Sequence, residues 1–71
     1  MKIGYYDEVK RMYEAVVWED YNNLLLDEAY TSKVEAVKAV KAFIKNYKGN
    51  GKLDYYVRFF DFENDFSEDV Y

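Results

Sequence analysis

Hydrophobic positions follow a helical period in the middle of the chain. Apolar side chains recur every three or four residues at Val34, Val37, Val40, Ile44 and Tyr47. This spacing places them on one face of an α-helix. Ser32 stands three residues before Glu35, as in a capping box, and Gly49 lies just beyond the last apolar position. The pattern therefore predicts a helix that begins at Thr31-Ser32 and continues through Tyr47.

The period changes from helical to alternating after the turn sequence Gly49-Asn50-Gly51. Residues 53–62 are rich in aromatic and β-branched side chains, which is typical of a strand. One face of this strand would carry Leu53, Tyr55, Val57 and Phe59. The other would carry Asp54, Tyr56, Arg58, Phe60 and Phe62. Because the second face is half aromatic, the strand either lies inside a sheet or presents aromatic rings to a partner.

Residues 7–30 admit two interpretations. As a helix reaching about Asp20 and capped by Asp7, the segment would align Val9, Met12, Tyr13, Val16 and Val17. As a hairpin, residues 13–18 and 24–30 form two strands joined by residues 20–23. We favour the hairpin, because residues 16–18 (Val-Val-Trp) are a β-type cluster and Asn22-Asn23 is typical of turns.

These elements predict an α+β fold of ββαβ order, in which one helix packs on a three-stranded sheet. The alternative places an N-terminal helix where the hairpin would be. Residues 1–71 would form a single small domain, and the acidic segment 63–71 would be either a frayed tail or a short edge segment. A chain of this length buries only about 60% of its unfolded surface, so stability should be marginal. The uncovered sheet face would then serve a homodimer or a target protein.

Composition argues against catalysis. The chain has no cysteine and no histidine, so it lacks a disulfide, a thiolate metal site and the commonest proton shuttle at neutral pH. A chain this short offers no deep cleft either. Residues 61–65 start like a calcium loop, but Phe66 replaces the glycine that the sharp turn needs. We expect no enzyme activity, no cofactor and no metal, and we expect a cytoplasmic protein without a membrane segment.

Charge is segregated along the chain. Residues 31–52 hold six lysines and one glutamate, whereas residues 53–71 hold one arginine and six carboxylates within a chain of net charge −4. The helix carries a lysine stripe, made of Lys38, Lys41, Lys45 and Lys48. Lysines opposite an apolar face usually serve solubility, and an acidic chain repels a nucleic acid. We therefore expect no direct binding of nucleic acid.

The acidic and aromatic C-terminal end is the candidate binding site. Nine tyrosines and five phenylalanines exceed what so small a core can hide, so several rings must reach the surface. Carboxylates can meet the basic residues that normally hold phosphates, while rings supply desolvated anchors. The expected partner-binding residues are Asp61, Glu63, Asp65, Glu68 and Asp69 for steering, and Tyr55, Tyr56 and Phe66 for anchoring.

The chain resembles, in general character, the small acidic anti-defence proteins of phages and mobile elements, among them the anti-CRISPR inhibitors. The resemblance lies in its size, its charge, the sequence Tyr30-Thr-Ser-Lys-Val-Glu-Ala-Val and the acidic end from Asp61 to Asp69. It implies a non-enzymatic inhibitor that binds a protein target such as a CRISPR effector in the host cytoplasm. The alternatives are a self-associating structural or regulatory domain and an immunity-type inhibitor of a toxin nuclease.

Overall fold

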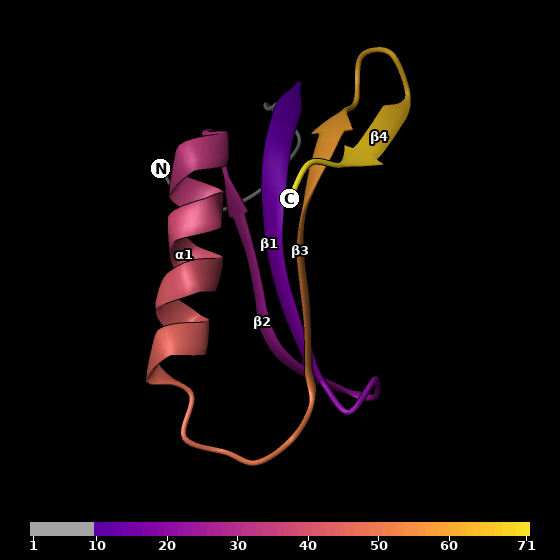
Figure 1. Cartoon of the computed structure of the whole chain (residues 1–71). Coiled ribbons are helices and arrows are strands. Elements are labelled where there is room, and N and C mark those ends of the chain that lie inside the picture. Colours follow the sequence, from indigo (N-terminus) through magenta and orange to yellow (C-terminus); the bar gives the residue numbers. More distant parts are fainter. Residues whose placement is uncertain (1–9) are drawn as a thin grey trace.

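The protein is a four-stranded antiparallel sheet with one helix against one face (Figure 1), as seen in a computed structural model that describes residues 10–71. The elements, in chain order, are β1 (Arg11–Glu19), β2 (Asn23–Tyr30), α1 (Lys33–Asn46), β3 (Leu53–Asp61) and β4 (Phe66–Asp69). The strands lie side by side in the order β2-β1-β3-β4. The α+β prediction is thus confirmed, with four strands in place of three.

The hairpin interpretation of the N-terminal half is confirmed for the part of the chain that the structure describes. β1 and β2 pair antiparallel from Glu19 opposite Asn23 to Tyr13 opposite Tyr30, with an irregularity at Val17-Trp18. The alternative helix is therefore wrong for residues 11–19, and its cap at Asp7 lies outside the described residues. β-branched and aromatic side chains decide the outcome, because they pack well on a pleated surface and crowd a helix.

The turn between β1 and β2 lies within the expected connection of residues 20–23, but its central residues are Asp20 and Tyr21. Asp20 and Tyr21 take the left-handed conformation, with φ of 53° and 68°, and the Asn22 N–H donates to the Glu19 carbonyl at 3.3 Å. Two consecutive positive φ angles match the twist of a β-hairpin. Asn22 is therefore the last residue of the turn, and Tyr21 occupies a central position that usually favours smaller residues.

α1 begins and ends close to the predicted residues. Ser32 is the N-cap, and its hydroxyl accepts a hydrogen bond from the Glu35 backbone N–H at 3.5 Å. The helix ends at Asn46 because Tyr47 is extended, with ψ of 129°. Gly49 is not a left-handed cap, since no described glycine has a positive φ. Instead, the Tyr47 ring lies so close to Gly49 that a side chain there would collide with it.

The core lies between α1 and the face of the sheet beneath it. Its fully buried residues, two from the helix and three from the strands, are Ala36, Val40, Ala15, Val17 and Val57. Leu26, Val37, Phe43 and Ile44 pack against them. One prediction is wrong: Val34 is 62% exposed, whereas Ala36, which was not predicted, is completely buried. The face of α1 that contacts the sheet is rotated relative to the predicted face, so that alanine side chains point toward the strands. Because alanine is small, the helix packs close to the sheet.

Candidate functional site

On the face of the sheet that carries α1, the helix does not cover β4 and the adjoining part of β3. α1 contacts β1, β2 and β3 but not β4, which lies at the edge away from the helix (Figure 1). Directly opposite residues of paired strands share a face, so Phe59 and Glu68 are neighbours, as are Asp61 and Phe66. We call the helix-side residues of this region the β3–β4 strip, which consists of Tyr55, Phe59, Phe66, Glu68 and Tyr71.

Aromatic rings form two groups along the β3–β4 strip. Phe59 lies between Tyr13 and Phe66, with ring centroids 5.0 Å and 6.4 Å away. The Tyr71 ring lies 6.2 Å from that of Tyr55, and the Lys41 ammonium of α1 lies 5.7 Å from its centroid. Rings arranged edge-on or tilted at these distances attract one another, so the strip is ordered before any partner arrives. Three of its rings, those of Tyr55, Phe66 and Tyr71, remain 44% to 50% exposed.

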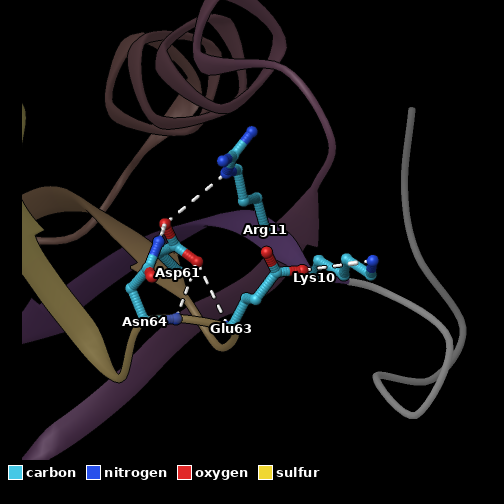
Figure 2. A network of polar contacts seen from close by, with 5 residues as sticks. All are labelled: Lys10, Arg11, Asp61, Glu63 and Asn64. Atoms are coloured by element: carbon cyan, nitrogen blue, oxygen red, sulfur yellow. Dashed lines mark hydrogen bonds and ion pairs between the residues drawn. The ribbon is translucent and has the colours of Figure 1, made fainter.

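Asp61 holds the loop between β3 and β4 in shape. Its Oδ1 accepts hydrogen bonds from the backbone N–H groups of Glu63 at 3.1 Å and Asn64 at 3.2 Å, and its Oδ2 accepts from the Asn64 amide at 2.9 Å. Arg11 of β1 lies 3.5 Å from the same carboxylate (Figure 2). The Asn64 side chain above all, followed by its backbone N–H and Arg11, lowers the pKa of Asp61. Asp61 is 7% exposed, so its carboxylate serves the fold and not an external contact.

The other predicted carboxylates fall into two classes. Glu63 forms an ion pair with Lys10 at 3.1 Å (Figure 2), and Asp69 accepts a hydrogen bond from Arg58 at 2.8 Å. That bond with Asp69 is the main cause that raises the pKa of Arg58. Asp65 and Glu68 are exposed, and neither forms an ion pair with any of residues 10–71. These two carboxylates are therefore the ones available to a basic partner.

The predicted anchors do not share one surface. Consecutive residues of a strand point to opposite faces, so Tyr55 and Tyr56 cannot contact the same flat partner. Tyr55, Phe66 and Glu68 belong to the helix side, whereas Tyr56 lies on the other side together with Asp69. Tyr56 also has a partner within the chain, because the Arg58 guanidinium lies 5.1 Å from its ring centroid.

Three further aromatic residues, which were not among the predicted partner-binding residues, lie close to this region: Phe60, Phe62 and Tyr71. Phe62 stacks on Phe60 at 5.8 Å and is 46% exposed. Together with Phe66 these rings line a hollow of about 280 Å³ at the end of the hairpin. The acidic composition of residues 63–71 does not indicate that the Tyr71 ring packs beside Tyr55. The alternation of Phe66, Glu68 and Val70 is the signal that could have indicated a strand there.

Three other kinds of site were considered in the described residues: the lysine stripe, a metal site and a membrane-spanning helix. All four lysines of the lysine stripe are exposed, but they do not form the predicted single stripe of the helix. Lys48 lies beyond the end of α1 at Asn46, and the Lys41 ammonium lies over the Tyr71 ring. Among the described residues no group of three or more His, Cys, Asp or Glu side chains is arranged to hold a metal ion. No helix within residues 10–71 has the length and apolar character that crossing a membrane requires.

Comparisons with protein-family models, with curated proteins and with solved structures found no match for this chain.

Proposed function

We propose that the protein is a non-enzymatic inhibitor that binds another protein through the β3–β4 strip and the adjoining loop. One observation carries this proposal: on the helix side of the sheet, where α1 does not reach β4, the rings of Tyr55, Phe66 and Tyr71 are 44% to 50% exposed. Aromatic rings of this kind are the residues that most often dominate binding energy at protein interfaces.

The charges beside the rings indicate the kind of target. Asp65 lies in the loop between β3 and β4 and Glu68 lies within β4, and neither forms an ion pair with a basic residue among residues 10–71. A surface that joins free carboxylates to rings complements a groove lined with lysine and arginine. Such grooves hold phosphates in nucleic-acid enzymes. Together with the resemblance to anti-CRISPR inhibitors, this supports a CRISPR effector or another nucleic-acid enzyme as the target.

The structure also shows which substitutions test the proposal cleanly. Asp61 and Asp69 are unsuitable, because neutralising either would break a contact that holds the hairpin. Asp65→Asn with Glu68→Gln removes charge alone, and Phe66→Ala removes a ring. Two matched controls lie elsewhere: Tyr21, a 67% exposed ring in the β1–β2 turn, and Asp54 at the opposite end of β3.

The test is surface-bound kinetics against a candidate effector nuclease, with circular dichroism to confirm folding. The charge variant should slow association several-fold and flatten its salt dependence, since steering acts before contact. Phe66→Ala should speed dissociation and weaken binding by about 2 kcal/mol, roughly 30-fold. Tyr21→Ala and Asp54→Asn should bind as the parent does. Full inhibition by the folded charge and ring variants would refute this site.

A further inference from the structure

β4 presents an open sheet edge, and the hydrogen bonds of its inner side show which groups face outward. The Val57 carbonyl accepts from the Val70 N–H at 2.8 Å, and the Val57 N–H donates to the Tyr71 carbonyl at 3.4 Å. Bonded positions alternate along an antiparallel pair, so Phe59-Glu68 and Asp61-Phe66 are bonded as well. The N–H and C=O groups of Ser67 and Asp69 therefore point away from β3.

No strand within residues 10–71 pairs with this outer edge, and all four residues of β4 are exposed. The other edge of the sheet is less accessible. By the same alternation the outward groups of β2 belong to Asp27 and Ala29, and Ala29 is only 5% exposed. β4 is thus the edge that an additional strand reaches most easily.

We propose that the target binds by strand addition, placing an extended basic segment along β4. This deepens the proposed function and rests on it. The backbone of the segment would pair with Ser67 and Asp69, and its side chains on the helix side would lie beside Phe66 and Glu68. Apolar side chains would contact the exposed rings, and a lysine or arginine would meet the carboxylate of Glu68.

The charge of β4 and its loop favours a basic strand over an acidic one at this edge. Charged residues on an edge strand repel strands of the same charge and discourage indiscriminate pairing. Glu68 and the nearby Asp65 would repel an acidic strand, including β4 of a second copy of this chain, which carries the same carboxylates. A basic strand gains both the backbone pairing and the ion pairs. The partner that fits is therefore an extended, lysine-rich or arginine-rich segment of another protein.

Amide hydrogen exchange of the full chain, followed by NMR, distinguishes strand addition from side-chain docking. The ligand is a short synthetic peptide in which every second residue is threonine and the residues between are valine and lysine in turn, so that valine and lysine share one face of the strand. A peptide with glutamate in place of lysine is its matched control. We expect the basic peptide to bind and to slow exchange at Ser67 and Asp69, with no change at Asp27 and Ala29 on β2. The acidic peptide should not bind.

Two variants complete the test. Ser67→Pro removes an outward N–H without breaking the ladder to β3, and it should weaken peptide binding about ten-fold. Asp27→Pro on the opposite edge is the matched control and should leave binding unchanged. Glu68→Gln should weaken binding about two- to five-fold and reduce its salt dependence.

Three results would overturn the inference: no binding of the basic peptide, binding without slower exchange at Ser67 and Asp69, or slower exchange on β2 instead. The proposed function fails separately, when Phe66→Ala and the charge variant inhibit the nuclease as well as the parent. Inhibition that depends on Phe66 but tolerates Ser67→Pro would retain the binding site and reject strand addition.

Discussion

At the scale of single residues, several polar side chains that look available in the sequence are used inside the fold. Tyr47 donates its hydroxyl hydrogen to Glu19, which raises the pKa of Tyr47, and the same oxygen accepts from the Gly51 N–H at 3.0 Å. Lys52 donates to the Tyr21 hydroxyl at 2.7 Å. These contacts fasten the loop after α1 to the β1–β2 turn. Polar residues at both ends of the sheet thus shape its loops.

Asp61 gives the sharpest prediction at this scale. Its folded pKa lies below the ordinary value of 3.8, so its contribution to stability is present above that pH and is lost as pH falls through the folded pKa. Asp61→Asn should therefore lower the unfolding temperature by several degrees at neutral pH, with the difference shrinking in acid. Thermal unfolding at pH 7 and below pH 3.8 measures it.

The matched control is Glu63→Gln, which removes only an exposed ion pair with Lys10 and should change stability by about 0–1 kcal/mol. An equal loss for Asp61→Asn at both pH values would show that shape, and not charge, makes Asp61 important.

At the scale of elements, α1 owes its position to its first turn. The Ser32 hydroxyl satisfies the Glu35 N–H, one of the donors that a helix start leaves without a partner. The chain enters this cap directly from Tyr30, the last residue of β2. The cap therefore fixes the start of the helix two residues after the end of β2.

Ser32→Ala should destabilise the protein by about 1 kcal/mol, because the loss of an N-cap oxygen leaves a backbone donor unsatisfied. Urea unfolding followed by circular dichroism measures the loss. Ser32→Asp is the matched control, since it keeps an acceptor at the helix start and should retain most of the stability. A neutral Ser32→Ala would mean that water replaces the cap at no cost.

At the scale of the whole molecule, a row of charged residues on neighbouring strands runs across the face of the sheet opposite α1. Glu14 of β1 lies opposite Arg58 of β3, which in turn lies opposite Asp69 of β4. Asp27 of β2 is the diagonal neighbour of Glu14 on the same face of the sheet. Burial first, and then Asp27, raises the pKa of Glu14, while Arg58 opposes the shift.

A raised pKa means that the folded state holds the Glu14 proton more tightly than the unfolded state. Its contribution to stability is therefore complete below the ordinary value of 4.5 and is lost as pH rises through the folded pKa. Glu14→Gln should stabilise the protein at pH 7 by about 0.2–1 kcal/mol, the size of a cross-strand like-charge effect. The gain should vanish below pH 4.5.

Urea unfolding at the two pH values measures this difference, with Glu68→Gln as a control that removes an isolated carboxylate. A Glu14→Gln protein that is less stable than the parent at pH 7 would show that attraction to Arg58 outweighs burial and Asp27.

The sequence by itself determined α1 and β3, because their signals are local, whereas it left residues 7–30 open between helix and hairpin and did not predict β4 as a strand. Ser32 and Glu35 stand three residues apart, and the alternation in residues 53–61 needs no distant contact to be recognised. The chemistry of the C-terminal end was also visible as composition, since its carboxylates and rings are neighbours in the chain.

The tertiary structure decided which side of each element faces the core and which charges remain free. Alanines give a weak hydrophobic signal, so only packing against the sheet shows that Ala36 is buried and Val34 is exposed. Asp61 meets Arg11 across 50 residues of chain, a contact that strand order creates. Pairing between distant strands decides which face each side chain lies on and which side chains it contacts. The position of the candidate binding surface therefore follows from the assembled sheet and not from the sequence.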